Sequence, residues 1–81
     1  MSLDSPDTLA SLRAMIAQSA AETSLDDAQY DYGHVNGWID ALFHSAVISG
    51  DALYALRNEA SDAFERAVTA LNNLASPPDS R

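Results

Sequence analysis

The stretch Leu25–Ala46, LDDAQYDYGHVNGWIDALFHSA, decides how the chain folds. Its apolar residues recur at intervals of three and four without a slip, at Leu25, Ala28, Tyr32, Val35, Ile39, Leu42 and Ala46. This spacing is typical of a helix that packs along its whole length on another helix. Gly33 and the pair Asn36-Gly37 favour a turn locally, and each glycine costs a helix about 1 kcal/mol against alanine. We call this row of apolar residues the seam of the helix. Because the seam keeps its spacing across both glycines, we predict one continuous helix over residues 25–47.

A second seam follows the short corner Ile48-Ser49-Gly50-Asp51. Ser49 is placed to cap a helix, and Ile48 and Leu53 occupy the two positions of a hydrophobic staple. The helix predicted over residues 50–75 repeats the spacing at Leu53, Leu56, Ala60, Ala63, Ala67, Ala70 and Leu74. So short a corner folds the two helices back on each other as an antiparallel hairpin.

Matching the two seams outward from the corner gives the register of this hairpin. The pairs are Ala46 with Leu53, Leu42 with Leu56, Ile39 with Ala60, Val35 with Ala63, Tyr32 with Ala67, Ala28 with Ala70, and Leu25 with Leu74. Through the middle a large residue meets an alanine, which allows close approach without voids.

A first helix is predicted over residues 6–22, with Ser5 as its N-cap and Pro6 at its first position. It carries two stripes: larger apolar residues at Leu9, Leu12, Met15 and Ile16, and alanines at Ala10, Ala14, Ala17 and Ala21. We therefore expect an all-α, three-helix bundle dominated by the long hairpin, as a single domain over residues 1–75. The sequence SPPDSR, residues 76–81, cannot continue a helix and is predicted to be a disordered tail.

Charge and composition narrow the function. The 81 residues include twelve acids, four arginines and no lysine, for a net charge of −8. An acidic chain lacks the cations that bind nucleic-acid backbone or anionic membranes, so neither direct partner is expected. No cysteine is present, which removes disulfides and thiolate metal sites. Without a secretory signal or a long apolar run, we expect a cytoplasmic protein, and the alanine- and arginine-rich composition is typical of a bacterial one.

The side of the 25–47 helix opposite its seam is not the charged surface that a solvent-facing helix usually carries. Its central positions are Tyr30, Gly33, His34, Gly37, Trp38 and Ala41, which together we call the outward face. Gly33, Gly37 and Ala41 form a row of small residues that lets another helix come close, beside aromatic side chains suited to an interface. For a continuous helix two interpretations stay open: the first helix covers the row with its alanine stripe, or another protein molecule does. A further alternative is a helix that is locally unwound at Asn36-Gly37.

No motif for catalysis is recognisable, and no cofactor or metal is expected. Asp31 and His34 have the spacing of carboxylate and histidine in di-iron bundles, but the complementary motif is missing, so a metal-dependent function is unfavoured. Two hypotheses remain for a non-enzymatic protein. The first is an interaction module, a homodimer through the outward face or a partner of another protein. The second is an acidic decoy for a nucleic-acid-binding complex, using Asp26, Asp27, Asp31, Glu59, Asp62 and Glu65.

Overall fold

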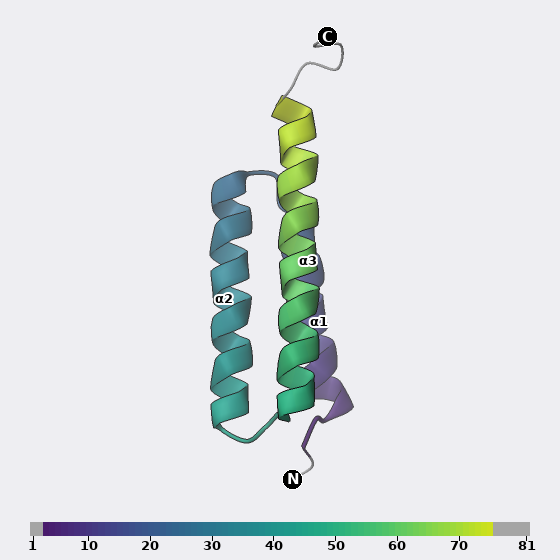
Figure 1. Ribbon diagram of the computed structural model, residues 1–81, viewed down its shortest axis with the longest axis vertical. Helices are drawn as coiled ribbons and strands as arrows, with labels where there is room; N and C mark the ends of the chain where they lie inside the picture. Colours follow the sequence, from purple (N-terminus) through teal and green to yellow (C-terminus); the bar gives the residue numbers. More distant parts are fainter. Residues whose placement is uncertain (1–2, 76–81) are drawn as a thin grey trace.

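The protein is an all-α, three-helix bundle, as the two seams predict. The computed structural model describes residues 3–75 and contains α1 (Pro6–Ala20), α2 (Leu25–His44) and α3 (Gly50–Ala75). Helices α2 and α3 run antiparallel as the predicted hairpin, and α1 lies along both (Figure 1). Helix α2 continues through Gly33 and Gly37 without interruption, and neither glycine has a positive φ. The predicted tail, residues 76–81, lies outside the described residues.

The seam between α2 and α3 forms the centre of the core. Val35 and Ile39 on α2 are at most 1% exposed, and Ala60 and Ala63 on α3 are fully buried. This is the large-against-small arrangement read from the sequence, and it lets the two helix backbones approach closely. One turn further along, the rings of Tyr32 and Phe64 stack with their centroids 4.7 Å apart.

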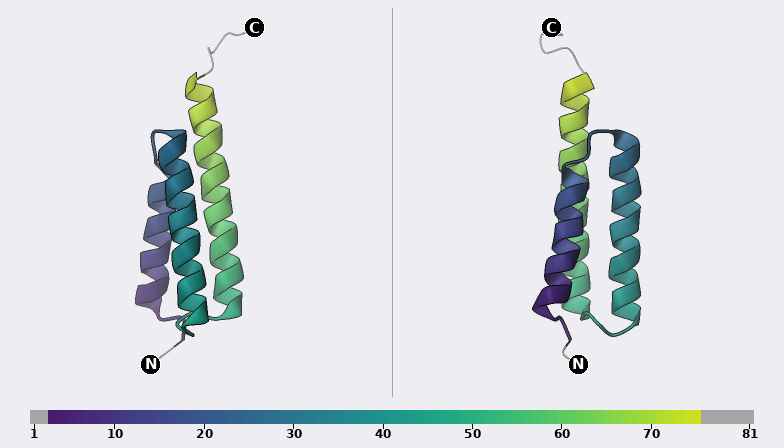
Figure 2. Two further views of the ribbon diagram at one scale, coloured as in Figure 1. Left: turned by 90° about the vertical axis from the view of Figure 1, so that its left-hand side faces the viewer. Right: turned by 180° about the vertical axis from the view of Figure 1, so that it is seen from behind.

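Helix α1 closes the core with its larger apolar stripe. Leu12 and Ile16 are 2% and 5% exposed and belong to the same cluster as the seam residues of α2 and α3. Seen from behind and from the side, α1 runs against both other helices (Figure 2). The buried Ser19 hydroxyl donates to the Ile16 carbonyl at 2.7 Å, so the helix satisfies its own buried polar group.

Helix α2 ends at His44, three residues earlier than predicted. The Ala46 N–H donates to the Phe43 carbonyl at 3.0 Å, and the Val47 N–H donates to the Leu42 carbonyl at 2.8 Å. These are the two bonds of a Schellman motif, with Ala46 at φ 60° in the left-handed position that glycine usually occupies. The early stop lets the chain turn so that Ile48 enters the core at 1% exposure. Helix α1 likewise ends at Ala20 rather than residue 22.

The corner between α2 and α3 is held from two sides. The Ser49 hydroxyl accepts from the Ala52 N–H at 3.1 Å, which confirms Ser49 as the cap of α3. Asp4, before α1, donates its N–H to the Val47 carbonyl at 3.0 Å and accepts from the Ser49 N–H at 2.8 Å. The segment preceding α1 is thereby fastened to the corner. At the start of α2, Ser24 accepts from the Asp27 N–H at 3.1 Å, whereas the side chain of Ser5, the predicted cap of α1, makes no capping bond.

The seam does not extend to the far end of the hairpin. Leu25 and Leu74 are 45% and 82% exposed, so the pair expected at the last position of the seam is not buried. The reason is the unequal length of the helices: α3 projects beyond the corner between α1 and α2 (Figure 1). Ala46, expected to pair with Leu53, lies in the turn after α2 and is exposed.

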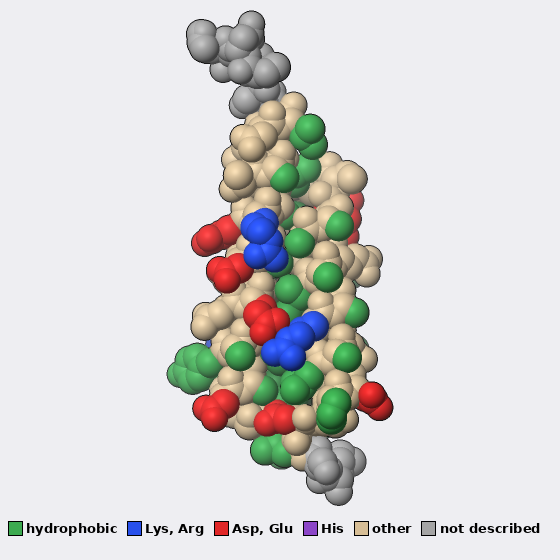
Figure 3. Space-filling model, turned by 90° about the vertical axis from the view of Figure 1, so that its right-hand side faces the viewer, with side chains coloured by type: hydrophobic (Ala, Val, Ile, Leu, Met, Phe, Trp, Pro, Cys, Tyr) green, Lys and Arg blue, Asp and Glu red, His purple; other side chains and the backbone are tan. Residues whose placement is uncertain are grey.

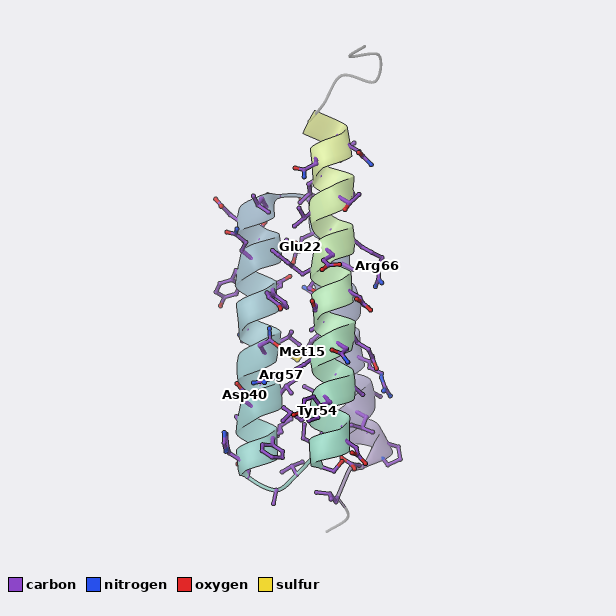
Figure 4. The ribbon with its side chains drawn as sticks, viewed as in Figure 1. Met15, Glu22, Asp40, Tyr54, Arg57 and Arg66 are labelled. Atoms are coloured by element: carbon purple, nitrogen blue, oxygen red, sulfur yellow. The ribbon has the colours of Figure 1, made fainter. Side chains whose placement is uncertain are left out.

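Ion pairs link the helices at the surface. Arg13 on α1 holds Glu59 on α3 with two bonds of 3.0 Å, and Arg57 on α3 reaches Asp40 on α2 (Figure 4). The face formed by α1 and α3 shows arginine beside acidic side chains, with hydrophobic side chains between (Figure 3). Within residues 3–75, no helix is long and apolar enough to cross a membrane.

Candidate functional site

The outward face of α2 is open to solvent in the single chain. Tyr30 is 70% exposed and Trp38 is 48% exposed, and the other four positions of the face are exposed as well. A Cβ placed on Gly33 or Gly37 would have no heavy atom within 4 Å, apart from its own helix and chain neighbours. The small-residue row therefore packs against nothing within the described part of the chain.

This openness removes one of the two interpretations of the row. Helix α1 does not cover it, because the alanine stripe of α1 is itself exposed: Ala10, Ala14, Ala17 and Ala21. The larger stripe of α1 enters the groove between α2 and α3 instead. Burying leucine and isoleucine removes more apolar area from water than burying alanine, so this orientation of α1 is favoured.

The aromatic residues beside the row form a contiguous ridge. The rings of Tyr30 and His34 stack at 5.8 Å, and His34 meets Trp38 edge to face at 6.5 Å. The Trp38 indole Nε1–H donates to His34 Nε2 at 3.2 Å. His34 therefore carries its own proton on Nδ1 in this arrangement. The bond fixes both rings relative to α2, which leaves a large and rigid exposed surface.

A groove runs between α1 and α2 on the other side of this ridge, and we call it the α1–α2 groove. Its larger hollow, about 410 Å³, is lined by Met15, Gln18, Tyr30, Asp31, His34 and Trp38. A second hollow of about 250 Å³ is lined by Thr8, Ser11, Leu12, Met15, Trp38 and Leu42. The two hollows share Met15 and Trp38 and so follow one another along the helices. Sequence reasoning missed this groove, because α1 contributes half of its lining and the position of α1 is a tertiary property.

One end of the groove is strongly acidic. Asp31 lines it, and the Oδ2 atom of Asp31 is buried without a hydrogen-bond partner. The pKa of Glu22 is raised, chiefly by a hydrogen bond with the Asp31 carboxyl group, with burial and the charges of Asp31 and Asp27 adding to the effect. Two carboxyl groups can share such a bond only when one of them holds a proton, so at neutral pH they repel.

The other residues considered for chemistry are not brought together. Among residues 3–75, no three His, Asp or Glu side chains are placed to hold a metal ion. His34 is bonded to Trp38, and Asp40, which also lies on α2, faces Arg57. His44 lies about one turn beyond Asp40 on α2, where its ring meets Phe43 with centroids 5.5 Å apart.

Comparison of the chain with protein-family models, with curated proteins and with solved structures finds no match. The geometry of the surface is therefore the basis on which a function is proposed.

Proposed function

We propose that the protein is a non-catalytic interaction module that forms a homodimer through the outward face of α2. The observation that carries this proposal is the bare row Gly33, Gly37 and Ala41, flanked by the exposed rings of Tyr30 and Trp38. Two mid-helix glycines weaken α2 and give the single chain no contact in return. A second helix backbone is the kind of neighbour for which the absence of side chains is an advantage.

A second copy of α2 fits the row in an antiparallel arrangement. With Gly37 of one chain against Gly37 of the other, Gly33 lies at the level of Ala41 of the second copy. Tyr30 then lies at the level of His44 of the second copy, so rings cover both ends of the contact. Aromatic anchors around a closely packed centre are typical of stable protein interfaces.

The substitution Gly37→Leu tests this proposal, because a leucine there has open space in the single chain. We expect the variant to keep its helical circular dichroism and its resistance to urea while its dimer dissociates in sedimentation experiments. The matched control is Asn58→Leu on α3, which adds a leucine at another exposed helical position and should leave the dimer intact. A wild-type chain that sediments as a monomer at every concentration contradicts the proposal.

The acidic decoy is a second candidate, favoured by the corner between α1 and α2. Asp26 lies in the first turn of α2 beside this corner, and the pKa of Glu22 is raised by its neighbours Asp31 and Asp27. Ionic strength separates the candidates. Binding of a basic partner weakens steeply with added salt, whereas two chains of net charge −8 associate as well or better when their repulsion is screened. The double variant Asp26→Asn, Asp27→Asn should abolish the decoy interaction and spare the dimer.

A further inference from the structure

The geometry points to the α1–α2 groove as a docking site for an amphipathic helix of another protein, with an arginine of that helix received by Asp31. This inference does not rest on dimerisation through the small-residue row. The groove lies between α1 and the ridge of Tyr30, His34 and Trp38, and the row lies on the opposite side of that ridge.

The shape of the groove indicates a helix as the occupant. On α1 its lining residues recur every three or four positions from Thr8 to Gln18, and on α2 they do so from Tyr30 to Leu42. At a rise of 1.5 Å per residue, ten residues of α1 extend about 15 Å, or nearly three helical turns. Two hollows in line along such a trough receive side chains one to two turns apart, which is the pattern of helix-in-groove recognition.

The lining of the groove suits apolar anchors at one end. Leu12 and Leu42 line the smaller hollow, and Met15 and Trp38 lie where the two hollows meet. Methionine is flexible enough to adapt to different apolar side chains, and the rigid Trp38 ring gives them a broad face. Addition of a fourth helix here would extend the three-helix bundle along its open side.

The charge at the other end of the groove favours a positively charged side chain of the occupant. Asp31 is the acidic side chain in the lining of the larger hollow, and its buried Oδ2 atom has no hydrogen-bond partner within the described residues. The charges that act on Glu22 beside it are those of the acids Asp31 and Asp27. The negative charge of Asp31 at this end of the groove therefore attracts a positively charged side chain of the occupant.

Within residues 3–75, the arginines lie elsewhere on the surface. Of the three arginines within residues 3–75, Arg13 holds Glu59 and Arg57 holds Asp40. Arg66 lines a different hollow on α3, beside Asp62 and Glu65. A second copy would bring a further charge of −8, so a basic partner is favoured over self-association at this groove.

The chemistry of the acidic end favours arginine over lysine. A guanidinium group presents a planar fork of donors that can bond the carboxyl groups of Asp31 and Glu22 together. Its flat face can also stack on the neighbouring Tyr30 or Trp38 ring. The expected recognition pattern is an arginine near one end of the partner helix, followed by bulky apolar residues one, two and three turns along the same face.

Selection from a peptide library tests this proposal directly. The probe is a displayed library of uncharged alanine- and glutamine-based helices of about 18 residues, with one face randomised. We expect the selected peptides to carry an arginine at one end of an apolar face. Their binding should change the fluorescence of Trp38, which is the single tryptophan of the chain.

Matched variants of the protein then locate the binding. Asp31→Asn should lower the affinity for the selected peptides about tenfold or more, since a hydrogen bond to a charged group is lost. Asp62→Asn removes the same charge on α3 and should have little effect. Ser11→Tyr fills the smaller hollow and should block binding, whereas Thr69→Tyr adds the same bulk at an exposed position of α3 and should not.

Several outcomes would overturn the proposal. These are a selection that returns no binder, binders without a cationic residue, and equal affinity for wild type and Asp31→Asn. A dimer that Ser11→Tyr dissociates and Gly37→Leu spares would show that a second copy occupies the groove. If Ser11→Tyr instead abolishes peptide binding and leaves the dimer intact, the groove and the proposed dimer interface are separate sites.

Discussion

The two sides of α2 belong to one helix and yet serve the molecule in opposite ways. On the inner side, Ala28, Val35 and Ile39 are at most 1% exposed, and each is matched by a neighbour on another helix. On the outer side, Gly33 and Gly37 touch nothing beyond their own helix. The inner side explains why the chain folds. The outer side costs about 2 kcal/mol of helix propensity for its two glycines and contributes no packing to the single chain.

That contrast supports the proposal that the outer side is an interaction surface. Small domains are stable by only several kcal/mol, so the cost of two glycines is a considerable part of the total. Places where a sequence breaks a local rule without a gain in the fold are commonly functional sites. The exposed Tyr30 and Trp38 lie beside the same row, which strengthens this interpretation.

The largest effect is expected on the inner side. Ile39→Ala removes a fully buried side chain and leaves a cavity among α1, α2 and α3, so the free energy of unfolding should fall by about 2–5 kcal/mol. Urea denaturation followed by circular dichroism measures it. The matched control is Leu74→Ala, at a side chain that is 82% exposed, where we expect a change of less than about 0.5 kcal/mol. Equal losses in the two variants would contradict the structure.

A smaller effect of opposite sign is expected on the outer side. Gly37→Ala and Gly33→Ala should each raise the free energy of unfolding of the monomer by about 0.5–1 kcal/mol. The physical reason is that alanine restricts the unfolded chain, and its methyl group meets no neighbour in the fold. The measurement is urea denaturation at a concentration low enough to keep the chain monomeric. A destabilised monomer would mean that the row is covered within the chain.

The smallest effect concerns Glu22, in the corner between α1 and α2. Its pKa is raised above 4.5 by Asp31, so the folded state holds this proton more tightly than the unfolded state. The stability from this group is present below pH 4.5 and is lost as the pH rises through the folded pKa. The urea midpoint of Glu22→Gln should therefore increase relative to that of wild type as the pH rises from about 4 to 7.

The control for this experiment is Glu65→Gln, which removes a charge on α3 remote from Asp31. A difference between Glu22→Gln and wild type that shrinks as the pH rises would mean that the two carboxyl groups do not interact as described.

Much of the bundle could be predicted from the sequence, because the spacing of apolar residues within each helix is a local property. Intervals of three and four place residues on one side of a helix whatever the surroundings, so both seams and the unbroken α2 were predictable. The burial of Val35 and Ile39 in one cluster with Ala60 and Ala63 was also predictable, since large residues on one helix match small ones on the other in the middle of the hairpin. The outward face was recognised for the same reason, as the remainder of a helix whose inner side was already assigned.

The sequence by itself thus determined the three helices, the hairpin and the small-residue row. Only the tertiary structure decided on which side α1 lies, because α1 carries two apolar stripes and local spacing cannot rank them. That decision left the row bare, created the α1–α2 groove, and placed Asp31 at its acidic end beside Glu22. It also set the end of α2, where the burial of Ile48 outweighs the cost of a left-handed Ala46. The packing side of α1 and the end of α2 depend on the apolar area buried and the charges brought together by segments that are distant in the sequence. A short stretch of sequence does not contain this information.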